Sequence, residues 1–133
     1  MRGQILGLLL SVFLAGGVLA QARDIESTID RQLQAFSVDD FETAFTFASP
    51  NLQRLFQTPS NFQRMVVQGY PMVWRFREVD FLELTERSGA LWQRVRIVDA
   101  QGMTHILDYR MLETPTGCRI NGVQILDAAD FSA

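Results

Sequence analysis

The chain has 133 residues, 47% of them hydrophobic, and its 12 basic and 15 acidic side chains give a net charge of −3. This length fits one domain, and the composition is typical of a globular protein. All basic residues are Arg, and they are too few to neutralise a phosphate backbone, so we expect no nucleic-acid partner. The single Cys118 and the single His105 exclude an internal disulfide and multi-ligand Cys or His metal sites. We therefore expect no metal and no other cofactor.

Residues 1–22 have the pattern of a secretory signal peptide. One positive charge precedes an apolar run over residues 5–14, and small residues follow it. Cleavage after Ala20 or after Ala22 would suit a signal peptidase, and we prefer the second site, which leaves a single domain over 23–133. An uncleaved anchor is the alternative, because the uncharged stretch is nearly long enough to span a bilayer. We expect a periplasmic or secreted bacterial protein that meets a membrane only through an uncleaved segment.

The first half of the domain is predicted to be helical. A helix is expected to start at Asp24 and to bury one face, formed by Ile25, Ile29, Leu33 and Phe36. Ser37, Ser49 and Thr58 are predicted caps of three further helices, and Pro follows the last two of them. Gly69 is expected to be the residue just after the end of the last helix. The Phe residues of these helices are interpreted as core, with the lining of a ligand cavity as the alternative: Phe36, Phe41, Phe45, Phe47, Phe56 and Phe62.

The second half is predicted to be an antiparallel meander. The β-rich segments are 74–86, 90–99, 103–113 and 118–127, and the loops between them are 87–89, 100–102 and 115–117. Each loop has three residues and ends in Gly, as in a type I turn followed by a residue in the left-handed region. The predicted fold class is therefore α+β, with N-terminal helices packed on a curved four-stranded antiparallel sheet.

This loop type predicts a register that brings apolar side chains together. The expected pairs are Glu86–Ala90, Phe81–Val95, Val79–Ile97, Val95–Leu107, Gln93–Tyr109, Thr114–Cys118, Leu107–Ile125 and Tyr109–Val123. Opposite charges also meet in Asp80–Arg96, Arg94–Asp108 and Glu113–Arg119, which we interpret as ordinary cross-strand pairs, with anion capture as the alternative. A slip of one residue would turn a whole strand to the other face.

The face that packs on the helices carries the candidate pocket residues. They are Glu83, Gln93, His105, Tyr109 and Asn121. In the row Glu83–Gln93–Tyr109, a carboxylate beside a phenol could act as a base and a hydrogen-bond donor, as in isomerase chemistry. The alternative is that Glu83 reaches water and Tyr109 belongs to the core. His105 could carry a proton, or it could be an exposed or singly bonded residue.

The outer face of the sheet carries the candidate interface residues. They are Leu82, Leu84, Trp92, Arg110 and Leu112, and Ile120 is expected on the same face. A contiguous apolar patch marks an interaction surface, so this face predicts a homodimer or a docking site. Cover by the C-terminal segment 128–133 is the alternative.

Several short motifs resemble one bacterial family. They are Gln32–Phe36, Ala48–Pro50, Gly69–Pro71 and Gly117–Val123, and their order over 24–127 is similar to that in the secreted proteobacterial proteins grouped as domain of unknown function 4864. Helices followed by a long meander also resemble the nuclear transport factor 2-like, or cystatin-like, cone of ketosteroid isomerase and of polyketide cyclases of the SnoaL type. The resemblance implies a fold and an export route, and it implies no established activity.

These features favour a non-catalytic accessory domain that binds a small apolar or amphipathic ligand in the cone. The second hypothesis is an interaction module that uses the outer face. The third is a small isomerase, dehydratase or cyclase with Glu83 as its base.

Overall fold

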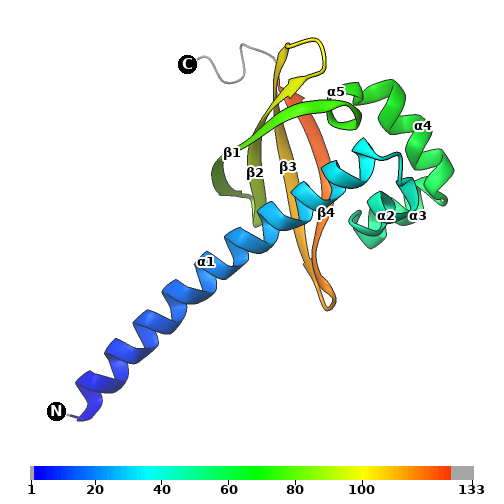
Figure 1. Cartoon of the computed structure of the whole chain (residues 1–133). Coiled ribbons are helices and arrows are strands. Elements are labelled where there is room, and N and C mark those ends of the chain that lie inside the picture. Colours follow the sequence, from blue (N-terminus) through cyan, green and yellow to red (C-terminus); the bar gives the residue numbers. More distant parts are fainter. Residues whose placement is uncertain (1, 127–133) are drawn as a thin grey trace.

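The computed structural model describes the backbone of residues 2–126 and the side chains of residues 17–126. The elements are α1 (Arg2–Ser37), α2 (Phe41–Thr46), α3 (Pro50–Phe56), α4 (Pro59–Gly69), α5 (Pro71–Trp74), β1 (Phe76–Arg87), β2 (Ala90–Asp99), β3 (Thr104–Thr114) and β4 (Gly117–Leu126). The strands form an antiparallel meander in the order β1-β2-β3-β4, and the helices pack on one of its faces (Figure 1). The predicted α+β class is confirmed.

Helix α1 crosses the face of the sheet, and its first turns extend beyond the sheet (Figure 1). Asp24 lies inside this helix, so the predicted start there is wrong. The predicted apolar face is buried as expected, with Ile25, Ile29, Leu33 and Phe36 each at most 1% exposed. The processing of residues 1–22 stays a prediction. Within the part of the chain that was described, no helix has both the length and the apolar character of a membrane span.

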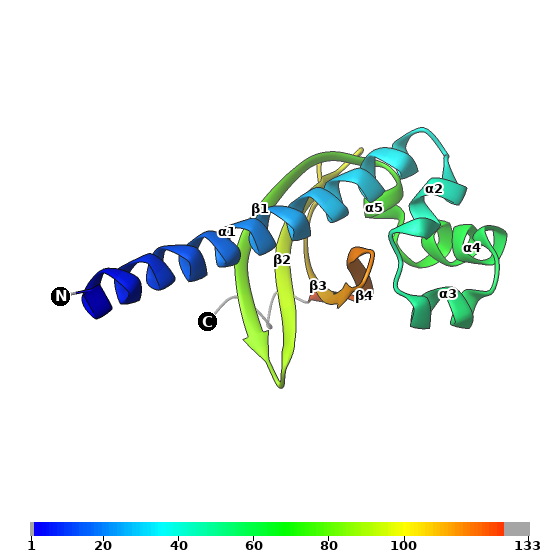
Figure 2. The same ribbon diagram turned by 90° about the horizontal axis from the view of Figure 1, so that it is seen from below.

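Helices α2, α3 and α4 lie together beside the β4 edge of the sheet (Figure 2). Ser49 and Thr58 cap α3 and α4 as predicted, because each hydroxyl accepts a hydrogen bond from a backbone N–H three residues later. The predicted cap at Ser37 is wrong, because Ser37 is the last residue of α1. Asp40 caps α2 instead and accepts from Thr43 N at 3.1 Å.

The short helix α5 was not predicted. Pro71 follows α4 and also begins α5, since the first position of a helix needs no backbone N–H donor. Strand β1 consequently starts at Phe76, two residues later than expected.

The middle hairpin, β2–β3, has the predicted register. Val95 pairs with Leu107, and Gln93 pairs with Tyr109. The backbone closes the loop through Asp99 N, which donates to Met103 O at 2.9 Å.

The first hairpin is one residue shorter than predicted. Arg87, rather than Glu86, pairs with Ala90, and the two-residue loop has positive φ at Ser88 (51°) and Gly89 (79°), as a type I′ turn requires. A β-bulge then places two residues of β1, Leu82 and Glu83, opposite one residue of β2, Arg94. The bulge restores the predicted register from Phe81 onward.

The third hairpin is shortened in the same way. Thr114 pairs with Gly117, rather than with Cys118, so Glu113 faces Cys118 and the predicted Glu113–Arg119 pair is wrong. An irregularity at Asn121 then adds one residue to β4, and the predicted register returns at Arg110–Gly122 and continues through Tyr109–Val123.

Residues between each turn and its bulge therefore lie on the face opposite to the predicted one. Leu84 and Ile120 move from the outer face to the core, where Ile120 is 2% exposed. Glu83 moves the other way, to the outer face, where it pairs with Arg94. The centre of the core lies between α1 and the two middle strands, with Val95, Ile97 and Leu107 fully buried.

The two-residue turn can be tested by adding one methyl group. Gly89→Ala should lower the free energy of unfolding by about 1 kcal/mol, because Cβ is disfavoured at positive φ. Gly69→Ala is the matched control: its Cβ would meet no heavy atom within 4 Å and it lies at the end of α4, so stability should be unchanged or slightly raised. Urea unfolding measures both. Equal effects would contradict the assigned turn.

Candidate functional site

An apolar cavity of about 310 Å³ lies between the helices and the β3–β4 half of the sheet. Its wall consists of Gln32, Phe36, Ala48, Leu52, Phe56, Phe62, Met65, Val66, Tyr70, Val73, Tyr109, Ile120, Gly122 and Val123. Among these lining residues of the described chain, none is charged. Because most of the wall comes from four separate helices and two strands, the cavity exists only in the folded domain.

An aromatic cluster around Phe62 forms the helical wall. The Phe62 ring centroid lies 5.9 Å from that of Phe36, 5.3 Å from that of Phe45 and 5.8 Å from that of Phe56, with tilted ring planes. Such tilted pairs at these distances are favourable beyond the area they bury. Of the six Phe residues interpreted as core, Phe36, Phe56 and Phe62 also line the cavity.

Two tyrosines bring hydroxyl groups to this mostly apolar wall. Tyr109 on β3 is only 1% exposed, and burial, followed by the neighbouring Tyr70, raises the pKa of Tyr109 well above its ordinary value. Its hydroxyl therefore stays protonated at neutral pH and can donate a hydrogen bond. Tyr70, between α4 and α5, donates its hydroxyl hydrogen to Val123 O at 3.0 Å.

Gln32 places an amide at the same cavity. It lies three residues after Ile29 and four before Phe36, so its helical spacing puts it on the apolar face of α1. Its Nε2 donates to Ala44 O at 3.1 Å, and the side chain is 5% exposed. Sequence reasoning missed both Gln32 and Tyr70 as pocket residues. A polar residue on the buried face of a helix is the signal that could have revealed Gln32.

Asn121 supports the cavity from behind rather than facing it. Its Oδ1 accepts a hydrogen bond from Ser49 Oγ at 2.7 Å, and Ser49 Oγ in turn accepts from Leu52 N. The backbone joins here as well, because Ser49 N donates to Ile120 O and Ile120 N donates to Phe47 O, both at 2.8 Å. The bulge at Asn121 thus holds the start of α3, which carries Leu52 and Phe56 into the wall.

The expected row Glu83–Gln93–Tyr109 does not form. Gln93 does pair with Tyr109, but it is absent from the cavity wall in the described chain, and its Nε2 donates to Leu82 O at 3.0 Å and to Arg94 O at 2.9 Å. It stabilises the first bulge by satisfying these carbonyl groups. The placement of Glu83 beside Tyr109 is wrong, because the bulge turns Glu83 to the outer face.

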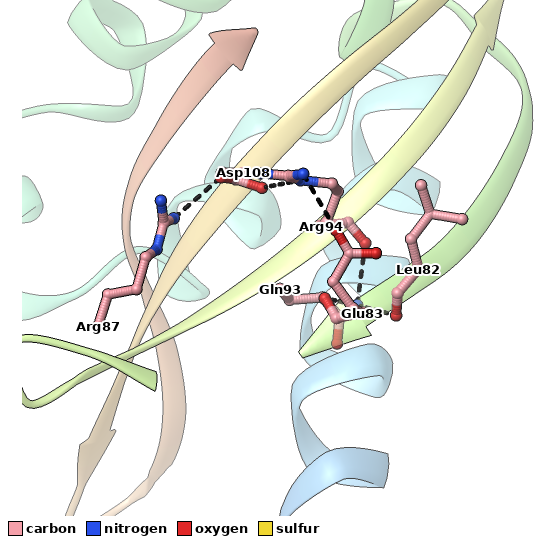
Figure 3. A network of polar contacts seen from close by, with 6 residues as sticks. All are labelled: Leu82, Glu83, Arg87, Gln93, Arg94 and Asp108. Carbon is pink, nitrogen blue, oxygen red and sulfur yellow. Dashed lines mark hydrogen bonds and ion pairs between the residues drawn. The ribbon is translucent and has the colours of Figure 1, made fainter. Parts of the chain in front are cut away.

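Glu83 instead joins an ionic network on the outer face (Figure 3). Asp108, 2% exposed, accepts from Arg94 Nε at 2.9 Å, from Arg94 Nη2 at 3.0 Å and from Arg87 Nη2 at 2.9 Å. Arg94 Nη1 also lies 3.1 Å from Glu83 Oε1. The predicted pair Arg94–Asp108 is confirmed, and Arg87 is an addition to it.

The network keeps Asp108 ionised although it is buried. Burial by itself would raise the pKa of Asp108, but the hydrogen bonds and charge of Arg94, with a smaller effect of Arg87, hold it below its ordinary value. Both charges of the buried pair are therefore satisfied within the sheet, which supports a structural role.

His105 lies away from the cavity, near the β2–β3 turn. It pairs with Ile97 as predicted, and its Nε2 lies 2.8 Å from Asp99 Oδ2. Asp99 Oδ1 accepts hydrogen bonds from Gln101 N and Met103 N, both at 2.9 Å. The bond to His105 and these backbone bonds lower the pKa of Asp99. This geometry fits the singly bonded alternative and a role in closing the turn.

The candidate interface on the outer face is smaller than expected. Leu82 is 40% exposed, and Leu112 is half-buried. Leu84 packs against the core instead, so its placement on this face is wrong. Trp92 is stacked by two guanidinium groups, with Arg87 Cζ 4.4 Å and Arg110 Cζ 5.9 Å from its ring centroid. The segment 128–133, expected as an alternative cover, lies outside the described residues.

The fold and the cavity define an α+β domain whose helices enclose an uncharged space against an antiparallel sheet. Residues 18–133 match the family model described as domain of unknown function (DUF4864), and the chain belongs to this family. No curated protein and no solved structure matched the chain.

The Asp108 network predicts how stability depends on pH. A carboxyl group whose folded pKa is lowered contributes stability above its unfolded pKa of about 3.9, and this contribution is lost as the pH falls through the folded pKa. Asp108→Asn should therefore flatten the loss of stability between about pH 5 and pH 2. Asp80→Asn, in the exposed pair with Arg96, is the control and should leave the slope nearly unchanged. Thermal unfolding across this range tests the prediction, and identical slopes for all three proteins would contradict it.

Removing Arg94 tests the same network at neutral pH. Arg94→Met should cost about 2–3 kcal/mol, less than the ~3–5 kcal/mol of a buried charge left without any partner, because Arg87 still pairs with Asp108. Urea unfolding measures this cost. A loss below about 0.5 kcal/mol, as for an exposed ion pair, would show that the network is not needed.

Because Ser49 also bonds to β4, substitutions of the caps of α3 and α4 should lower stability by different amounts. Ser49→Ala removes the cap of α3 and also the hydroxyl that donates to the half-buried Asn121. It should therefore lower the free energy of unfolding by about 2–3 kcal/mol. Thr58→Ala removes only an exposed cap of α4 and should cost about 1 kcal/mol. Equal losses in urea unfolding would argue against the link between the bulge and α3.

Proposed function

We propose that this domain binds a small apolar or amphipathic molecule in the cavity between its helices and β3–β4. The observation that carries the proposal is the uncharged space of about 310 Å³ inside the domain. The cavity is partly open to its surroundings, so a small molecule can enter it and exchange. Ligand pockets have volumes of roughly 300–1,000 Å³ and are mostly apolar, with a few polar groups.

The size of the cavity sets the size of the ligand. An apolar cavity of about 150 Å³ takes up one benzene molecule. A volume of about 310 Å³ therefore suits a body of two fused rings, or an aliphatic body of similar size.

The same geometry favours binding over catalysis. The candidate base Glu83 lies on the outer face and pairs with Arg94, and the wall residues in the described chain include no carboxylate, His or Cys that could act as a base or nucleophile. An isomerase, dehydratase or cyclase that uses Glu83 therefore gains no support. We infer an accessory role for the domain, with the helices and the meander arranged as a nuclear transport factor 2-like cone around the ligand.

The interaction-module alternative has weaker support. The outer face keeps Leu82 and Leu112 as apolar groups, but Leu84 and Ile120 belong to the core. Trp92 is already engaged by two Arg side chains. A homodimer through this face would have to displace or use these guanidinium groups.

We also propose that residues 1–22 direct export and that the ligand is met in the periplasm or outside the cell. The proposal rests on the charge, the apolar run and the small residues at the start of the chain. The intact mass of protein recovered from an expressing bacterium should match a chain that begins at Arg23 or, with the other cleavage site, at Gln21. A mass that includes residue 1 would contradict export with cleavage.

Filling the cavity tests the binding proposal. Naphthalene should bind protein recovered from cells expressing the full sequence, and Val123→Phe should weaken binding at least tenfold, because the larger side chain occupies part of the cavity. Ile125→Phe is the matched control on the same strand: Ile125 is 42% exposed and is not among the wall residues, so binding should persist. Calorimetric titration measures both, with circular dichroism as the check of folding. The proposal is contradicted if the folded wild-type protein binds neither naphthalene nor the amphipathic 2-naphthol, or if Val123→Phe binds naphthalene as tightly as the wild-type protein does.

A further inference from the structure

Two polar atoms on the cavity wall have no protein partner among the described residues. Tyr109 is 1% exposed, and its hydroxyl takes part in none of the hydrogen bonds of the described chain. Gln32 is 5% exposed, and only its Nε2 is used, in the bond to Ala44 O, so Oε1 is free to accept. The third polar side chain of the wall, Tyr70, differs from these two because its hydroxyl donates to Val123 O.

These two atoms border open space rather than protein. In the described part of the chain, every fully enclosed side-chain nitrogen or oxygen has a hydrogen-bond partner. The free oxygens of Tyr109 and Gln32 must therefore contact some remaining space, and the cavity is the space that both residues line. A ligand that fills this space takes water away from both atoms, so a ligand that bonds to them is favoured over one that leaves them without a partner.

We propose that the cavity is a binding site for an uncharged molecule that carries a hydroxyl group on an apolar body of about two rings, recognised by the hydroxyl of Tyr109 and the amide oxygen of Gln32. This inference rests on the proposed function and names the class of ligand. A hydroxyl group suits the pair because it can accept a hydrogen bond from Tyr109 and donate one to Gln32 Oε1.

The absence of charge from the wall residues of the described chain selects against ionised ligands. A carboxylate or an ammonium group entering this space would lose its hydration without meeting an opposite charge, which is far more costly than burying a neutral hydroxyl group. Tyr109 cannot supply a negative charge for a cation either, since burial keeps its hydroxyl protonated. The charged groups of the ionic network, Arg87, Arg94 and Asp108, line a second hollow that shares Tyr70 and Val123 with the cavity, and there they are already paired with one another.

Three probes with the same ring system test this inference: 2-naphthol, naphthalene and 2-naphthoate. Each is titrated by calorimetry at neutral pH into the protein recovered from cells expressing the full sequence. We expect 2-naphthol to bind about three- to tenfold more tightly than naphthalene, the effect of one net hydrogen bond, and 2-naphthoate to bind most weakly. Because the comparison uses wild-type protein, it does not depend on the folding of any variant.

Substitutions of Tyr109 and Gln32 then assign the preference to their atoms. Tyr109→Phe should lower the 2-naphthol preference, because it removes the donor of one of the two proposed hydrogen bonds. Gln32→Met, which keeps the length of the side chain but removes the acceptor, should also lower the preference. Gln34→Met is the control: Gln34 is exposed on α1 and does not line the cavity, so the preference should persist.

The outcomes separate this inference from the proposed function. If naphthalene and 2-naphthol bind equally well, or if Tyr109→Phe keeps the preference, the hydroxyl class is wrong although the cavity still binds ligands. Tightest binding of 2-naphthoate would overturn the requirement for a neutral ligand. If none of the three probes binds, the proposed function itself fails, and the inference fails with it.

Discussion

The alternation of side chains along a β-strand is the constraint on which the rest of this domain depends. Each strand must keep one face on the helices, and a shift of one residue would turn that face outward. Two hairpins have loops of only two residues, so each has one extra residue in a strand, at 82–83 and at Asn121. The amide of Gln93 binds carbonyl groups at the first bulge, and Ser49 binds Asn121 at the second. The bulges thus keep the core continuous.

The second bulge also connects the sheet to the helices that build the cavity. Ser49 caps α3, binds Asn121 and donates its backbone N–H to Ile120 O, so the start of α3 is held against β4. Helix α3 has no buried residue of its own, and its inward side chains Leu52 and Phe56 line the cavity. A space therefore remains between α3, α4 and the sheet, where a longer or more apolar helix would have filled it.

The two faces of the sheet separate charge from apolar surface. Asp108 and Arg94 satisfy each other on the outer face, while Tyr109, the next residue of β3, points to the cavity side. Of these two successive residues of β3, Asp108 stabilises the sheet on its outer face and Tyr109 is proposed to recognise the ligand on the other face. Glu83 belongs to the charged side because of the first bulge, which is why a binding role is better supported than acid–base chemistry.

Sequence reasoning alone predicted the α+β class, the buried face of α1, the caps at Ser49 and Thr58 and the central pairing of β2 with β3. These features depend on local spacing, capping chemistry and the period of two, and all of these can be read along the chain. Only the three-dimensional structure shows that two loops are shorter than expected and that bulges compensate. A two-residue loop with a bulge and a three-residue loop without one give the same residue pairs far from the turn, so the sequence pattern does not distinguish them. The three-dimensional structure also decides that Gln32, Tyr70 and Tyr109 share a cavity, since the space between elements depends on how closely they pack and not on the pattern within any one of them.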